Sequence, residues 1–313
     1  MNTLKSGLLS GLRTTWELSK VIFPITVLVK VLQHTPILPW IIQILTPMMK
    51  WIGLPGEAAI PLVLGNFLNI YAAIGAILSL DLSVKHVFIL AMMLSFSHNL
   101  LIESSVAAKL GLKLRVIIGI RIGLAIMSAL VINLFWQGGN EPAQYGLVSS
   151  SSQVLNGWDQ ILWNGLQSAS LGILQIAMIV IPIMIFIQIL KDLSWLQIIS
   201  HWLSPATCFL GMKENTSLTL AAGLAFGLAY GAGVMLESYR EDGVSQKDMY
   251  LATVFLVSSH AVVEDTLIFI PLGIPVWPLL LVRLSIATLL TALVGLFWNK
   301  RDQHAYDKEN ISC

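Results

Sequence analysis

Two histidines, each followed closely by a carboxylic acid, stand in the middle of long apolar stretches of the sequence. His98 belongs to the run Ser-Phe-Ser-His-Asn-Leu-Leu-Ile-Glu, which ends at Glu103, and His260 belongs to the run Ser-Ser-His-Ala-Val-Val-Glu-Asp, which ends at Asp265. Imidazole and carboxylate groups bind divalent metal ions such as iron, manganese and zinc, and histidine also carries protons at physiological pH. These residue types therefore predict a site for a cation.

The spacing within each run limits how its groups could act together. In a straight helix, which turns by about 100° per residue, Glu103 lies about 140° away from His98, so the two cannot bind one ion unless the helix unwinds there. Glu264 comes four residues after His260 and would share its helical face. The second run therefore offers the better local pair of ligands.

A purely structural role is the alternative for the same residues. An ionisable group at bilayer depth costs about 3 kcal/mol or more, so it needs a partner or a polar cavity. Arg121 and Arg283, one predicted helix later, could neutralise Glu103 and Asp265 in two structural ion pairs. Each histidine could likewise make only a structural hydrogen bond, and both interpretations stay open at the level of sequence.

The composition shows which kind of element must position these groups. Of the 313 residues, 56% are hydrophobic and 11% charged, and the mean hydropathy is +0.79, as in integral membrane proteins. The net charge of +1 leaves no basic field for nucleic acid. The two cysteines cannot build a disulfide framework or a cysteine-rich zinc site. We therefore expect a lipid bilayer as the partner, and no nucleic acid.

The two histidine runs belong to an internal repeat. Ser97-His98 and Ser259-His260 are 162 residues apart, as are Arg121 and Arg283, and earlier in the chain Gly53 and Gly211 are 158 residues apart. Repeats of this kind are common in transporters. We predict a first repeat at 1–136, an extracytoplasmic loop at 137–164, a second repeat at 165–298 and a cytoplasmic tail at 299–313.

Length and charge predict the helices of each repeat. The stretches 37–51 and 195–209 suit interfacial helices, and the glycine-broken stretches 57–79 and 215–237 suit re-entrant hairpins. With hairpins, each half crosses the membrane three times, and the basic clusters fall on the cytoplasmic side while 137–164 falls outside. The fold predicted is all-α: an inverted repeat with about six transmembrane helices, two hairpins, two interfacial helices and both termini inside.

The glycine-broken stretches are predicted to form the other half of the site. Interrupted helices expose backbone groups that are tolerated at membrane depth only when protein or water covers them, and their ends offer partial charges to a solute. Asn66 and Asn69 near the first interruption and Tyr230 near the second are the candidate contacts. Small residues that merely allow close helix packing are the alternative for the glycines.

The order of these elements resembles the nucleoside-recognition, or Gate domain, family. The resemblance covers about 11–298, through Gly53-x-Pro-Gly56-Glu57, Gly65-Asn66, Ser97-His98-Asn99 and Glu103-Ser104. This family includes concentrative nucleoside transporters, the membrane part of FeoB-type ferrous iron transporters, and spore maturation proteins. Resemblance implies an inverted-repeat transporter core with the solute between hairpin tips and broken helices. The chain departs from the iron transporters in lacking a phosphate-binding loop and gate cysteines.

The sequence thus predicts a secondary transporter of the bacterial cytoplasmic (inner) membrane, most simply for a divalent metal ion. No cofactor, catalytic nucleophile or enzyme activity is expected, and a homo-oligomer is compatible with the sequence. The alternatives are transport of a nucleoside-like organic solute, with the acids serving a coupling ion, and a membrane sensor that transports nothing. The predicted solute contacts are Asn66, Asn69, Ser97, His98, Asn99, Glu103, Tyr230, Ser259, His260, Glu264 and Asp265. The predicted metal ligands among them are His98, Glu103, His260, Glu264 and Asp265.

Overall fold

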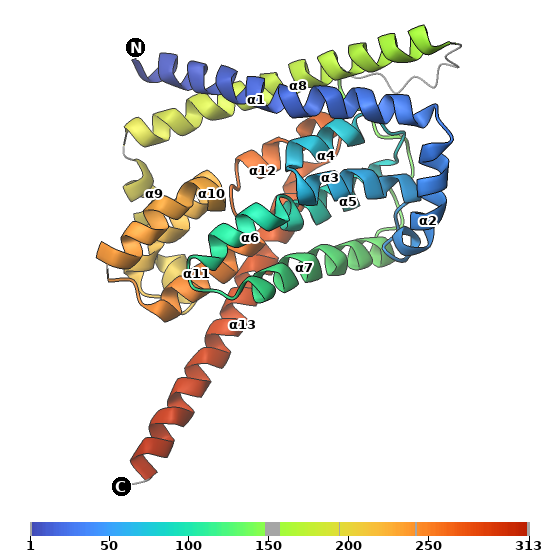
Figure 1. Ribbon diagram of the computed structural model, residues 1–313. Helices are drawn as coiled ribbons and strands as arrows, with labels where there is room; N and C mark the ends of the chain where they lie inside the picture. The colour runs from blue at the N-terminus through green and yellow to red at the C-terminus, as the bar shows by residue number, and fades with distance from the viewer. Residues whose placement is uncertain (1, 148–156, 194, 242, 312–313) are drawn as a thin grey trace. The chain divides into compact units, whose positions relative to one another are not determined.

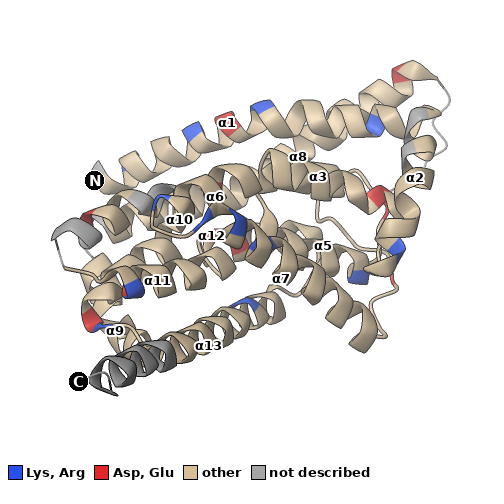
Figure 2. Ribbon diagram, turned by 60° about the horizontal axis from the view of Figure 1, so that its bottom comes forward, with Lys and Arg blue, Asp and Glu red and all other residues tan. Residues whose placement is uncertain are grey.

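The computed structural model describes residues 2–147, 157–193, 195–241 and 243–311, and every regular element among them is a helix (Figure 1). Four helical stretches in this part of the chain are long and apolar enough to cross a membrane: Val84–Ala108, Leu114–Phe135, Trp158–Leu190 and Val276–Trp298. An all-helical membrane protein is thereby confirmed. The count of six spans stays a prediction, since α1 (Asn2–Gln33) carries charged residues along its length (Figure 2) and is not among the four.

The chain forms two compact units, and each takes residues from both predicted repeats. Unit 1 consists of Met1–Leu101, Arg121–Asp192 and Val263–Leu280. Unit 2 consists of Ile102–Ile120, Leu193–Val262 and Leu281–Cys313. Two long helices, α7 (Leu114–Phe135) and α13 (Val276–Ile311), contribute to both units.

In unit 1, α1 lies antiparallel along α8 (Trp158–Asp192) (Figure 1). Small residues permit the close approach: a Cβ at Gly7 would lie 2.7 Å from the Cα of Ile185, and one at Gly11 would lie 2.9 Å from the Cα of Ile181. The two helices occupy corresponding places in the predicted repeats. Their opposite directions agree with an inverted repeat, which for the whole chain stays a prediction.

The first glycine-broken stretch is a helical hairpin in unit 1. After the short helix η1 (Gly56–Ala58), α3 (Ala59–Phe67) and α4 (Ile70–Ile77) fold back on each other, so that a Cβ at Gly65 would meet that of Ala73 at 2.9 Å. The interruption lies at Leu68–Asn69, beyond the expected Gly65–Asn66. Asn69 determines its place, because its side chain accepts a hydrogen bond from the amide of Ala72 and caps α4.

The second glycine-broken stretch folds back in the same way in unit 2. It follows η2 (Glu214–Thr216) and forms α10 (Ser217–Glu241), which is interrupted at Gly227 (φ 76°, ψ 177°) instead of the expected Gly223. A Cβ at Gly231 would lie 3.1 Å from the carbonyl oxygen of Ala222, a contact that a straight helix forbids. Gly227 is 158 residues after Asn69, so the two interruptions correspond.

The remaining helices frame these hairpins. The two predicted interfacial helices occur with the expected bounds, α2 (Ile37–Trp51) in unit 1 and α9 (Trp195–Phe209) in unit 2. The histidine runs both interrupt helices. In the first half α5 (Val84–Ser97) and α6 (Leu100–Ala108) flank the interruption; in the second half α11 (Gln246–Ser258) precedes it, with α12 (Glu264–Leu267) and η3 (Ile270–Leu272) after it.

Candidate functional site

Each histidine stands at the point where its helix is interrupted, and the backbone geometry there is the same in both halves. The residues that follow, Asn99 and Ala261, have φ of 49° and 43°, a left-handed conformation that costs about 1–3 kcal/mol. Their amides donate to carbonyl oxygens of the hairpins, Asn99 to Gly65 at 2.7 Å and Ala261 to Gly223 at 3.1 Å. Helix unwinding at His98, one of the two possibilities seen in the sequence, is therefore observed.

Two fully buried arginines stabilise these interruptions. In unit 1, Arg121 donates from Nε to the carbonyl oxygen of Phe96 at 2.8 Å and from Nη2 to that of His98 at 2.5 Å. In unit 2, Arg283 donates from Nη2 to the carbonyl oxygen of His260 at 3.1 Å. The guanidinium groups thus bind carbonyls that the broken helices leave without helical donors, a role the sequence interpretation missed. The predicted ion pairs with Glu103 and Asp265 stay predictions.

Within each unit, the histidine of one half faces an acid of the other half. His98 Nε2 lies 3.9 Å from Asp265 Oδ1 in unit 1, and His260 Nε2 lies 3.1 Å from Glu103 Oε2 in unit 2. All four side chains are buried. Sequence reasoning selected these four residues but did not predict the exchange of partners between the repeats. The equal spacing of the duplicated runs was the only available signal.

The hydrogen bonds of the histidines fix where their protons lie. His98 Nδ1 is 2.7 Å from the carbonyl oxygen of Leu94, and His260 Nδ1 is 2.9 Å from that of Leu256. A carbonyl oxygen only accepts, so Nδ1 carries a proton in both rings and Nε2 faces the carboxylate. A neutral ring presents a lone pair to that carboxylate, and two lone pairs repel. Each pair is therefore stable only when one proton or one cation lies between its members.

Glu264 has a different partner from the one its spacing indicated. Residues 259–263 lie outside any helix, so the expectation that Glu264 shares a helical face with His260 is wrong. In unit 1 the carboxylate of Glu264 accepts a hydrogen bond from the hydroxyl of Tyr71, which is 9% exposed on α4. Tyr71 was missed in the sequence, since a single tyrosine in an apolar hairpin has no distinguishing spacing.

The predicted amide and hydroxyl contacts are largely engaged in local structure. Asn66 Nδ2 donates to the carbonyl oxygen four residues earlier at 2.7 Å, and Ser97 Oγ does the same at 2.9 Å. Asn69 caps α4. Ser259 Oγ is buried and makes no hydrogen bond to the described residues. Tyr230 lies on α10, but its side chain falls outside what the structure describes.

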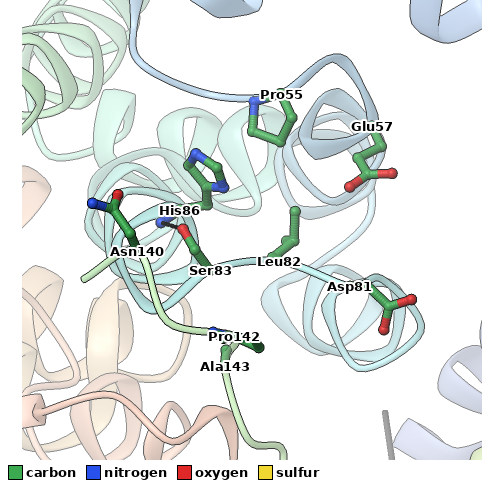
Figure 3. Close-up of a pocket in the computed structure, with 9 residues that line it drawn as sticks. All are labelled: Pro55, Glu57, Asp81, Leu82, Ser83, His86, Asn140, Pro142 and Ala143. Carbon is green, nitrogen blue, oxygen red and sulfur yellow. Dashed lines mark hydrogen bonds between the residues drawn. The ribbon is translucent and has the colours of Figure 1, made fainter. Parts of the chain in front are cut away.

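A second polar cavity, of about 540 Å³, opens in unit 1 between the first hairpin, the start of α5 and the segment 140–143 (Figure 3). Two carboxylates, Glu57 and Asp81, lie on one side of it, and His86 and Asn140 lie on the other. No Lys or Arg occurs among its described lining residues. Burial, together with the charge of Asp81, raises the pKa of Glu57 above its usual value. This cavity is separate from the residues singled out in the sequence.

Comparison with known proteins gives two findings. The model of the Gate family, described as nucleoside recognition, matches residues 15–135 and again residues 173–292. The chain is also 59% identical over 306 residues, 98% of both chains, to a Bacillus subtilis (strain 168) protein named "Uncharacterized membrane protein YvoD". Two matches to one family model agree with the internal repeat that the residue spacing indicated.

Proposed function

Because this chain belongs to the Gate family of membrane proteins, we propose that it is a secondary transporter whose solute is a divalent metal ion. The ion is held where the two halves meet within each unit, by the histidine–carboxylate pairs. The protein resides in the bacterial cytoplasmic membrane with both termini inside, and it moves the ion by alternating access between the two repeats.

The observation that carries this proposal is the exchange of histidine and acid partners. His98 with Asp265, and His260 with Glu103, are buried pairs whose facing atoms require one positive charge between them. Imidazole and carboxylate together suit iron, manganese and zinc. Two ligand atoms that each lie about 2.1 Å from an ion can be up to about 4.2 Å apart, so both pairs are close enough to share an ion.

A nucleoside-like organic solute has less support from the side chains. It would depend on amide hydrogen bonds, but Asn66 and Asn69 already use theirs within α3 and at the start of α4. Asn99 contributes its left-handed backbone and its amide to the interruption after α5. The divalent cation therefore remains the leading solute.

Purified protein reconstituted in liposomes tests the proposal. We expect saturable uptake of Mn²⁺, read with a trapped fluorescent indicator, and its loss in His260→Ala and in Glu103→Gln. Glu17→Gln is the matched control, since Glu17 is an exposed acid paired with Lys20 on α1. Saturable uridine uptake without Mn²⁺ uptake would establish the organic solute instead. Absence of any saturable flux would favour a membrane sensor.

A further inference from the structure

A hydrogen bond joins the first hairpin to the second half of the chain inside unit 1. Tyr71, the second residue of α4, donates from its hydroxyl to Oε1 of Glu264, the first residue of α12. The two residues are 193 positions apart in the sequence. This contact therefore reports directly on whether the hairpin and α12 stay together.

The repeat offers no counterpart to this bond. The position 158 residues after Tyr71 is Ala229, and the position 162 residues before Glu264 is Ile102, so neither corresponding residue can form a side-chain hydrogen bond. The histidine–acid pairs, the arginines and the left-handed residues all occur twice. An interaction found once in a duplicated framework points to a task that the two halves do not share.

Glu264 is also next to the acid of the unit 1 pair. Asp265 follows it in the same four-residue helix, and the Asp265 carboxylate faces His98 at 3.9 Å, which is longer than a hydrogen bond. A cation drawn to His98 and Asp265 therefore approaches the start of α12, where Glu264 stands. Its attraction for the Glu264 carboxylate competes with the hydrogen bond from Tyr71, since both act on the same oxygen atoms.

We infer that Tyr71 and Glu264 form a latch, released by the cation, that keeps the first hairpin closed on α12 while unit 1 holds no ion. The inference rests on the proposed function, since the releasing ligand is the transported cation. Tyr71 is a positioning residue: it holds the hairpin through Glu264 and does not bind the ion. The latch would prevent the hairpin from opening when no cation is present and so link movement to loading.

Other contacts leave the hairpin dependent on this bond. Within unit 1 it is also tied by the amide of Asn99 to the carbonyl oxygen of Gly65, and by Thr26 Oγ1 to that of Gly75 at 3.3 Å. Both accept on backbone atoms and are indifferent to a cation. Only the Tyr71 bond ends on a carboxylate. A hydrogen bond to a charged group corresponds to about a tenfold change in an equilibrium constant.

Thiol labelling of the hairpin tests the latch. Cys208 and Cys313 are first replaced by serine, and Ala72→Cys, at a position that is 0% exposed next to Tyr71, serves as the reporter. We expect slow labelling by a water-soluble maleimide, about tenfold faster labelling with saturating Mn²⁺, and equally fast labelling without Mn²⁺ once Tyr71→Phe is added. Tyr250→Phe is the control, since it removes a hydroxyl from a ring that contacts Trp298 in unit 2.

The result separates this inference from the proposed function. If Mn²⁺ uptake in liposomes is saturable but Tyr71→Phe labels like Tyr250→Phe, the latch is wrong and the transporter stands. If Tyr71→Phe also leaves the apparent Mn²⁺ affinity unchanged, where competition predicts an increase of about tenfold, the competition for Glu264 is excluded. If the unaltered protein transports no Mn²⁺, the proposed function fails first.

Discussion

The interruptions after His98 and after His260 share a backbone framework but differ in their charged groups. Both have a left-handed residue, an amide that binds a hairpin carbonyl, a histidine that binds the carbonyl four residues back, and a buried arginine. The facing acid lies 3.9 Å from the histidine in unit 1 and 3.1 Å away in unit 2, and the Tyr71–Glu264 bond occurs in unit 1. The duplicated framework thus serves stability, and the differing charges serve the solute.

The arginines give the largest effect expected from the shared framework. Arg121→Met and Arg283→Met each leave buried carbonyl oxygens without a donor and should cost about 3 kcal/mol or more of stability. Arg121→Lys should not rescue, because one ammonium cannot reproduce the two-pronged geometry toward Phe96 and His98. Thermal denaturation followed by size-exclusion profiles measures the loss. A near-neutral result for either arginine would break the equivalence of the two frameworks.

The acids should separate the two units by their effect on transport. Asp265→Asn is expected to reduce the kcat/KM of Mn²⁺ uptake by about a hundredfold, the cost of removing one charged ligand. Glu103→Gln should reduce it by about tenfold, because unit 2 lacks a neighbour such as Glu264. Initial rates in liposomes, with protein amounts matched by immunoblot, give both values. Equal losses would show that the units handle the cation alike.

Two corresponding glycines should be equally sensitive if the frameworks are equivalent. A Cβ at Gly65 would lie 2.3 Å from Leu94 Cδ2, and one at Gly223 would lie 2.4 Å from Leu256 Cδ1. Gly65→Ala and Gly223→Ala should therefore each destabilise by about 2 kcal/mol through overpacking. Gly119→Ala, with open space around it, is the control and should be tolerated. Melting temperatures in detergent test the pair, and a large difference between them would disprove the shared packing.

The smallest effect concerns the separate cavity of unit 1. Burial and the charge of Asp81 raise the pKa of Glu57, so the folded state binds its proton more tightly than the unfolded state. Glu57 therefore favours folding below the unfolded pKa, and this contribution disappears as the pH rises through the folded pKa. Glu57→Gln should flatten that dependence and raise stability at pH 7 by less than about 0.5 kcal/mol. Melting curves between pH 4 and 8 would reveal an opposite slope.

The sequence was sufficient for features that depend on local periodicity and duplication. The apolar stretches 37–51 and 195–209 predicted α2 and α9 with their observed bounds. Glycine and asparagine marked both hairpins, although the interruptions came later than expected, at Asn69 and Gly227. Which residue caps or kinks a hairpin depends on packing: Gly65 is needed for its contact with α4, and Asn69 is free to cap it.

Contacts across the chain were beyond sequence reasoning. The pairing of His98 with Asp265, 167 residues away, follows from the way the halves interlock and leaves no local pattern. Tyr71 carries no spacing signal at all, and its importance appears only when Glu264 lies beside it. The spacing argument for Glu264 failed because it assumed a helix through residues 259–263, where the chain is instead held open by hydrogen bonds to the second hairpin.

Pulsed electron paramagnetic resonance of Mn²⁺ bound to the detergent-purified protein tests the central claim most directly. If the buried histidine–carboxylate pairs hold the transported cation, the echo decay shows modulation from a coordinated ¹⁴N nucleus. His98→Gln and His260→Gln should then each reduce that modulation, while Glu17→Gln leaves it unchanged. Tightly bound Mn²⁺ without nitrogen modulation, or modulation that survives both histidine substitutions together, would contradict the account.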